Sequence, residues 1–397
     1  MLRVAILAEF PLTALNGGGA VGRGGGQGCT WLPQLALEFQ EHHDLEIHWL
    51  VLDRTIRRTV VFEALGQWFH RVPSVKFSVD LALNYLPARF GLGREVRRIR
   101  PDVVHAWGAE LAYPVALRDC HCPTIFSMQG SLTEYQRIGG LPDDWRWRKM
   151  VASEPGYVNT ATVVTAESKW ASERVRELKP DVDCRIVDYG VHPSFFEAKW
   201  SPDPNVPSAI YIGGGGYRKG IDVLLESLRR IPNRNWTMRF AGDAELGREV
   251  AAAGLPNTEF LGMLKWSDLL KEMTKSWCLV MPTRCDTGPT VVKEARVVGM
   301  PVIGTTHGGL RDYIRHGENG WIADPLNPST LAAGLKCVME SHETACRMGL
   351  SHLGEDRAFF APSLTAEKFA AIYHELASRA NQAAAKKPQD SRETPTQ

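Results

Sequence analysis

The sequence contains no run of about 18 apolar residues, which is the length that a membrane-spanning helix requires. It has no excess of charge either, because 46 lysines and arginines stand against 45 aspartates and glutamates and the net charge is +1. This balance argues against a nucleic-acid binder that depends on a basic field. The 8 cysteines are scattered, and the Cys120-His121-Cys122 segment has no second cluster with which to complete a zinc site. We therefore expect a cytoplasmic protein with free thiols, no bound metal and no nucleic-acid partner.

The length of the chain and its alternating pattern predict two α/β domains. A chain of 397 residues exceeds the size of one ordinary hydrophobic core. Short apolar runs that fit strands alternate with stretches that fit helices, which indicates parallel sheets. We expect an N-terminal domain over 1–192, a proline-rich linker over 193–208 and a C-terminal domain over 209–360. A further helix is predicted over 361–379, followed by a disordered tail over 380–397 that lacks hydrophobic bulk.

Residues 278–320 carry the most informative pattern, which is strand–loop–helix repeated twice. A buried strand over 278–281 leads through the loop 283–288 to a helix that we expect to start at Pro289. Helix N-termini attract anions, so the amides of Thr290 and Val291 could hold a phosphate. Asp286 and Glu294 bracket this helix start, and carboxylates there would serve hydroxyl groups rather than phosphate. A capped surface helix with ordinary acidic residues is the structural alternative.

Three spaced motifs in this region resemble a known family. They are Asp286-x7-Glu294, Gly308-Gly309-x-x-Asp312 and His316-Gly317-Glu318-Asn319-Gly320. This order resembles the donor site of retaining, two-domain GT-B glycosyltransferases of the GT4-like family (glycosyl transferases group 1). The resemblance implies an α/β GT-B fold with two Rossmann-like domains that face each other across a cleft. It also implies hexosyl transfer from a UDP- or GDP-sugar with retention of configuration and without a cofactor.

The resemblance also assigns roles to residues. Glu294 would bind the ribose, Asp286 the hydroxyls of the donor sugar, and Lys219 the departing diphosphate. The donor would also contact the Gly-Gly loop at Gly25 and Gly26 and the residues Gly288, Thr290, Val291, Gly213 and Gly214.

Two positions depart from the family pattern. The arginine that clamps the diphosphate in the family falls on Gly214, so we expect Arg218 to replace it. Gln129 stands where the family commonly carries a histidine, and an amide can hydrogen-bond a sugar but cannot transfer a proton.

The acceptor is expected to bind the N-terminal domain through loops near 10–30, 53–75 and 130–150. A glycan, a lipid-linked or a small-molecule acceptor is compatible with the sequence. The segment 135–150 is rich in arginine and tryptophan and could form a basic amphipathic surface together with the arginines of 94–100. Peripheral membrane contact at the inner face and a solvated charged face are both open, and the second is favoured. In the family, the C-terminal helix crosses back to the N-terminal domain.

The Asp181-Val182-Asp183 segment spells a metal-binding signature of another glycosyltransferase fold, but its position argues against that role. It lies where the chain enters a strand, opposite the ligand-binding end of a parallel sheet. We therefore expect metal-independent activity that persists in excess EDTA. A non-catalytic nucleotide-sugar-binding protein and a nucleotide-sugar epimerase of the same fold are the alternative functions.

Overall fold

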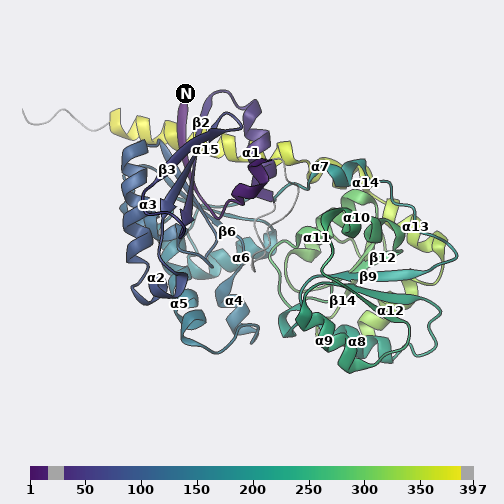
Figure 1. Ribbon diagram of the computed structural model, residues 1–397. Helices are drawn as coiled ribbons and strands as arrows, with labels where there is room; N and C mark the ends of the chain where they lie inside the picture. Colours follow the sequence, from purple (N-terminus) through teal and green to yellow (C-terminus); the bar gives the residue numbers. More distant parts are fainter. Residues whose placement is uncertain (17–30, 386–397) are drawn as a thin grey trace, which may run out of the picture.

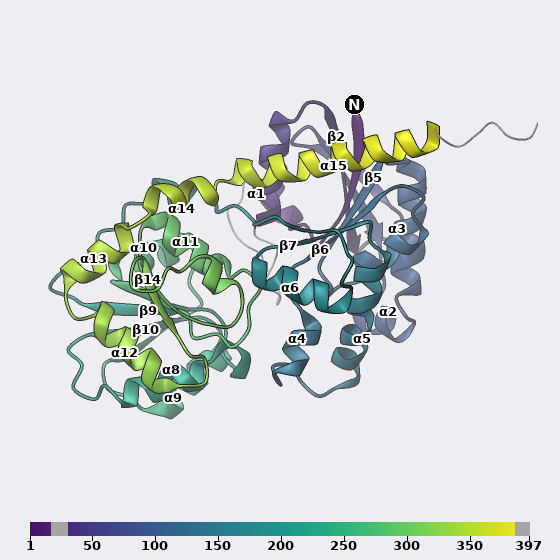
Figure 2. The same cartoon turned by 180° about the vertical axis from the view of Figure 1, so that it is seen from behind.

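The structure is a computed structural model that describes residues 1–16 and 31–385 (Figure 1). Gly25, Gly26 and the end of the expected tail, 386–397, lie outside the described residues. The chain forms two sheets with helices around each, and the two units lie side by side (Figures 1 and 2). The predicted α/β class with two Rossmann-like domains is confirmed. Within the described residues, no helix combines the length and the apolar composition needed to cross a bilayer.

The N-terminal domain is built on an eight-stranded sheet in the order β3-β4-β2-β1-β5-β6-β7-β8. All neighbouring strands are parallel except the antiparallel pair β3 and β4. The strands are β1 Leu2–Leu7, β2 Leu45–Asp53, β3 Val60–Ala64, β4 Gln67–Pro73, β5 Val103–Trp107, β6 Thr124–Met128, β7 Val163–Ala166 and β8 Cys184–Ile186. The helices are α1 Trp31–Glu38, α2 Phe77–Ala82, α3 Leu86–Ile99, α4 Leu132–Arg137, α5 Trp145–Thr160 and α6 Lys169–Leu178.

Apolar side chains cover both faces of this sheet. Alternate residues of β1 belong to two separate hydrophobic clusters, Ala5 and Leu7 to one and Val4 and Ile6 to the other. This is the pattern expected of a strand that is buried on both faces of a parallel sheet.

The C-terminal domain has a six-stranded, all-parallel sheet in the order β11-β10-β9-β12-β13-β14. Its strands are β9 Ser208–Ile212, β10 Thr237–Ala241, β11 Thr258–Gly262, β12 Cys278–Val280, β13 Val302–Thr305 and β14 Gly320–Ala323. Its helices are α7 Pro193–Glu197, α8 Ile221–Arg229, α9 Ala244–Ala253, α10 Trp266–Lys275, α11 Thr290–Val298, α12 Pro328–Val338, α13 His342–Leu350 and α14 Leu353–Phe359.

The last helix, α15 Pro362–Ala385, leaves the C-terminal domain and lies along the N-terminal sheet (Figures 1 and 2). The Tyr373 hydroxyl is 2.8 Å from Nδ1 of His105 on β5, and Arg185 of β8 donates to Glu375 at 3.0 Å. The expected start of the tail at 380 is wrong for 380–385, which continue the helix. That segment is alanine-rich, and alanine favours helix without requiring a packed apolar face.

Two further segments contain regular structure. The linker expected over 193–208 includes α7, whose Phe195 is fully buried in the core of the C-terminal domain. Pro193 occupies the first turn of α7, and the His192 ring accepts a hydrogen bond from the Ser194 amide at 3.2 Å.

The supposed acceptor loops contain regular structure as well. Most of 53–75 forms the β3–β4 hairpin, and α4 and the start of α5 occupy much of 130–150. Pairing of β4 with β2 supplies the hydrogen bonds that stabilise this hairpin at the sheet edge.

Candidate active site

The strand-end loops of the two domains meet at one place. The Thr287 hydroxyl, in the loop after β12, donates to the carbonyl oxygen of Gln129 after β6. Ser168, after β7, donates from its hydroxyl to the carbonyl of Thr287 at 2.6 Å. The Lys169 amide donates to the Asp312 carboxylate at 2.6 Å. Because ligands bind at the carboxyl ends of parallel strands, these loops define the candidate site.

Asp286 and Lys219 form an ion pair in this site. The Lys219 Nζ atom lies 2.7 Å from Oδ2 of Asp286, and the Arg218 guanidinium lies 4.0 Å from the same oxygen. Burial would raise the pKa of Asp286, but the charges of Lys219 and Arg218 outweigh that effect and lower its pKa. The structure thus brings together Asp286, Lys219 and Arg218, which were predicted to act on the sugar and the diphosphate.

The glycine pair of the second motif supports the Asp286 loop. The Gly309 amide donates to the Asp286 carbonyl at 2.8 Å. Gly308 has φ +86°, and a Cβ atom there would overlap that same carbonyl. Glycine is therefore required at 308 by both its backbone conformation and its close approach to the loop.

Glu294 lies in the second turn of α11 and is 6 % exposed. Its side chain makes no hydrogen bond or ion pair with any residue in the described part of the chain. Burial raises the pKa of Glu294 to about 8, and the neighbouring Lys293 charge opposes that rise only in part. A buried carboxyl group without a protein partner is suited to receive hydroxyl groups of a ligand.

The start of α11 provides backbone donors. The helix begins at Thr290, one residue later than we expected, so Pro289 occupies the N-cap position and not the first helical position. Val292 donates its amide to the Pro289 carbonyl at 3.0 Å, whereas the amides of Thr290 and Val291 bond to no backbone acceptor among the described residues. A Cβ atom on Gly288 would come within 2.5 Å of the Glu167 carboxylate, so glycine is needed where this loop meets the N-terminal domain.

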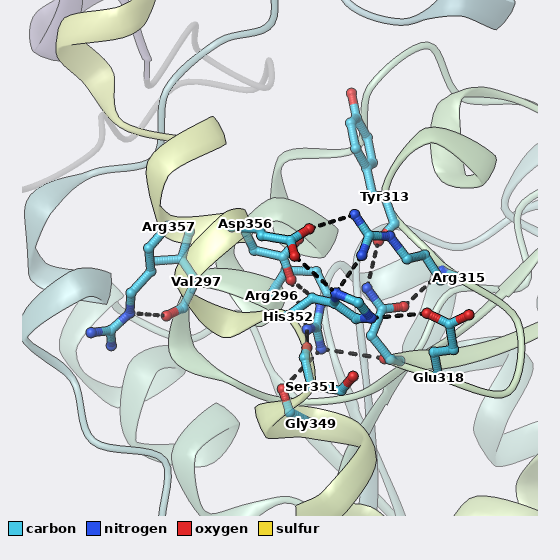
Figure 3. A network of polar contacts seen from close by, with 12 residues as sticks. Arg296, Val297, Tyr313, Arg315, Glu318, Gly349, Ser351, His352, Asp356 and Arg357 are labelled. Carbon is cyan, nitrogen blue, oxygen red and sulfur yellow. Dashed lines mark hydrogen bonds and ion pairs between the residues drawn. The ribbon is translucent and has the colours of Figure 1, made fainter.

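Arg296 fixes the far side of α11. Its fully buried guanidinium donates to the Asp356 carboxylate at 2.9 Å and to the carbonyls of Gly349 and Ser351 (Figure 3). These bonds attach α11 to α14 and to the end of α13. They hold Glu294, two residues earlier on the same helix, in a rigid setting.

The loop after β9 leaves little room for a side chain at 214. A Cβ atom on Gly214 would lie 2.7 Å from the Asp243 carboxylate. The amides of Gly215 and Gly216 donate to Asp243 and Glu249 at 3.2 Å each. Acidic side chains therefore already fill the space around this loop, and Gly213 and Gly214 lie beside them.

Arg218 is available to a ligand in a way that Arg284 is not. Arg218 lies over the Tyr135 ring at 4.6 Å and donates to the Cys285 carbonyl at 3.3 Å. Arg284 instead makes two bonds of 2.7 Å to Asp222 and stacks 3.8 Å from the Tyr217 ring.

We predict that Arg218→Ala lowers turnover about tenfold or more with little loss of stability, because it removes a cation beside Asp286. Arg284→Ala should mainly lower the melting temperature. Steady-state kinetics and thermal unfolding of both variants check this, and equal turnover of Arg218→Ala and wild type would contradict it.

Two groups of site residues were missed from the sequence. Glu110, after β5, lies against the Gln129-Gly130 turn, since a Cβ atom on Gly130 would overlap its carboxylate. Burial raises the pKa of Glu110 to about 7. Its position directly after a buried strand is the signal that could have identified it.

The second group is a buried cluster between the domains. Lys293 of α11 is fully buried, lies 2.8 Å from the Glu167 carboxylate and forms an ion pair with Asp188. Burial raises the pKa of Glu167 to about 8, and the two carboxylates raise the pKa of Lys293. We infer that Lys293 is charged at neutral pH and that Glu167 keeps its proton there.

The Asp181-Val182-Asp183 segment lies away from this site. Both Asp183 oxygens accept hydrogen bonds from Arg185, at 3.0 and 2.8 Å. Across residues 1–16 and 31–385 there is no group of three or more His, Cys, Asp or Glu side chains placed to hold a metal ion.

Each half of the chain matches a family model of known glycosyltransferases. Residues 32–195 match the family model described as Glycosyltransferase Family 4, and residues 194–350 match Glycosyl transferases group 1. A GDP-mannose-dependent alpha-mannosyltransferase of Mycobacterium tuberculosis is 26% identical over 64% of this chain and 68% of that protein. The matches span 44% and 55% of two other curated relatives, about half their length.

Solved structures of similar fold cover nearly the whole chain. Sucrose-phosphate synthase from Thermosynechococcus elongatus superposes with a TM-score of 0.77 at 15% identity, covering 96% of this chain and 100% of that one. Anabaena HepE in complex with UDP-glucose superposes with a TM-score of 0.68 at 15% identity, covering 95% and 100%.

Proposed function

Because this chain belongs to the GT-B glycosyltransferases of the group 1 family, we propose that it transfers a sugar from a nucleotide-sugar donor with retention of configuration. The two matched family models and the fold confirm the resemblance that the motif spacing predicted. The observation that carries the proposal is the ion pair between Lys219 and Asp286, which is 2.7 Å long. Asp286 lies in the loop that leads into α11, whose first amides have no backbone acceptor among the described residues.

The proposed donor is a UDP- or GDP-sugar. A relative is named as GDP-mannose-dependent, and a structural neighbour was solved with UDP-glucose. Glu294 would accept hydrogen bonds from the ribose hydroxyls, and the amides of Thr290 and Val291 would hold the distal phosphate. The donor would then span from α11 to Lys219.

Catalysis would act on the departing diphosphate. Negative charge grows on the leaving oxygen as the glycosidic bond breaks, and fixed cations and amides stabilise that charge without reorganising. Lys219, Arg218 and the α11 amides supply them. Asp286 is already paired with Lys219, so it is placed to bind sugar hydroxyls rather than to attack the anomeric carbon. We therefore favour front-face displacement over a covalent glycosyl-enzyme.

The acceptor, whether a glycan, a lipid-linked or a small molecule, would approach from the N-terminal domain. Gln129 and Glu110 lie there, after β6 and β5. Glu110 is the carboxyl group best placed to accept a hydrogen bond from the attacking hydroxyl.

The raised pKa of Glu294 predicts pH-dependent nucleotide binding. The ionised carboxylate accepts two ribose hydroxyls better than the acid does, so affinity should rise with pH towards about 8 and level off above it. Glu294→Ala should weaken the binding of donor and free nucleoside diphosphate by about tenfold or more. Calorimetric titration of wild type and Glu294→Gln from pH 6 to pH 9 checks this. The affinity of Glu294→Gln should not change over this range, because the glutamine side chain does not ionise.

Incubation with a panel of nucleotide sugars tests the reaction itself. We expect slow release of nucleoside diphosphate with one donor, together with a rise in melting temperature on binding of that diphosphate. Tight binding of a nucleotide sugar without any release, across all acceptors supplied, would instead identify a non-catalytic nucleotide-sugar-binding protein.

A further inference from the structure

One face of the N-terminal domain exposes large apolar side chains from three neighbouring elements. We call it the α2–α3–α5 face, and its members are Val75, Val79, Leu83, Leu86, Phe90 and Trp145. Phe90 is 68% exposed. Helix α2 packs against both α3 and α5, and Lys149, one turn after Trp145, donates to the Ala82 carbonyl at 3.3 Å. Figure 1 shows the three helices together on the side of this domain that faces away from the C-terminal domain.

The charge on the segment that carries five of these six apolar residues is predominantly basic. Beside the sixth, Trp145, the carboxylates of Asp143 and Asp144 form ion pairs with Arg148 and Arg146. Segment 75–100 contains six basic residues, namely Lys76, Arg89, Arg94, Arg97, Arg98 and Arg100, and two acidic ones, Asp80 and Glu95. Both acidic side chains are buried, so they present no negative charge at the surface. Arg89 and Arg98 have ion-pair partners, whereas the other four cations form no ion pair with any residue that the structure describes.

The exposed side chains follow one stripe of α3. Leu86, Phe90, Arg94 and Arg97 are spaced by four, four and three residues, which places them on the same side of a helix. The stripe is apolar in its first half and cationic in its second. Such a stripe matches a surface that is both apolar and negatively charged.

We propose that the α2–α3–α5 face docks on an anionic lipid bilayer. Leu, Phe and Trp side chains enter the boundary between headgroups and acyl chains, while the arginines contact acidic headgroups. A second copy of the chain is disfavoured, because pairing this face with itself would oppose arginine with arginine. Docking requires neither the donor nor the transfer reaction, so the proposal stands apart from the proposed function.

Sedimentation with vesicles tests the docking. The full chain should bind vesicles of equal parts phosphatidylcholine and phosphatidylglycerol, should bind phosphatidylcholine vesicles far less, and should be released at about 1 M salt. Arg94→Glu with Arg97→Glu should reduce the bound fraction by about fivefold or more per residue. Leu86→Ser with Phe90→Ser should reduce it by about tenfold or more.

Matched controls come from the C-terminal domain. Leu326→Ser removes a side chain that is 65% exposed, and Lys271→Glu reverses an exposed cation, so both should bind like wild type. All variants should keep the wild-type melting temperature. No binding of wild type to anionic vesicles, or equal loss in the control variants, would overturn the proposal. A dimer in sedimentation velocity that Phe90→Ser dissociates would overturn it in favour of a second copy.

Discussion

Lys219→Ala should lower kcat by about 100-fold to 1,000-fold while weakening donor binding much less. Its ammonium group lies 2.7 Å from the Asp286 carboxylate, which is where the proposed mechanism puts the departing diphosphate. In the proposed complex, the amides of α11 would neutralise much of the phosphate charge in the ground state. The additional charge of the transition state would then develop nearest to Lys219, so Lys219→Ala should lower mainly kcat.

Steady-state kinetics with the donor identified by nucleotide release would measure this effect, with direct titration for the donor Kd. Lys219→Arg should recover part of kcat because it keeps the charge. Lys271→Ala, which removes an exposed lysine of α10, should behave as wild type. A rise in Kd that accounts for the whole loss of kcat/KM would show that Lys219 binds the donor without favouring the transition state.

Lys293→Met should destabilise the protein by about 3–5 kcal/mol. Lys293 lies fully buried between Glu167 and Asp188, which come from the other domain. Its removal leaves two buried carboxyl groups with no cation, and the pair must then either protonate or carry an uncompensated charge. Because Lys293 precedes Glu294 on α11, the variant should also weaken nucleotide binding.

The stability lost in Lys293→Met should depend on pH. A carboxyl group whose pKa is raised in the folded state stabilises that state at low pH, and this contribution is lost as pH rises towards the folded pKa. Without the Lys293 charge, which lowers the pKa of Glu167, the pKa of that carboxyl group should rise further. The loss of stability in Lys293→Met should therefore be small near pH 5 and large near pH 9.

Urea unfolding of the variant at several pH values would measure the effect. The triple variant Lys293→Met with Glu167→Gln and Asp188→Asn should regain most of the lost stability, since no ionisable group remains in the cluster. Arg284→Met is a matched comparison that breaks an ion pair with the more exposed Asp222. Equal losses for Lys293→Met at pH 5 and pH 9 would rule out the buried charge as the cause.

Local signals in the sequence were sufficient for the strand–loop–helix unit around α11. A short apolar run, a proline and a terminal glycine mark its limits within a few residues. The eight-residue spacing of Asp286 and Glu294 is a property of one loop and one helix. Nothing distant in the chain needed to be known to place these two carboxylates at a helix start.

The residues that bind the diphosphate could be predicted only in part from the sequence. The sequence shows that glycine stands at 214, where the family has an arginine, and that Arg218 is the nearest arginine that could replace it. Only the structure revealed that Asp243 fills the space beside Gly214 and that Arg284 is bound to Asp222. Those facts depend on helices α9 and α8, which approach the loops through sheet packing.

The sequence alone determined the α/β class, the family and the order of the site motifs, because strand and helix periodicity and motif spacing are local. Tertiary structure decided which charges neutralise one another. Lys293 meets Glu167 across 126 positions, and Tyr373 meets His105 across 268. A single sequence carries no signal for such a pair, since both side chains look like ordinary polar residues until folding brings them together and excludes water from around them.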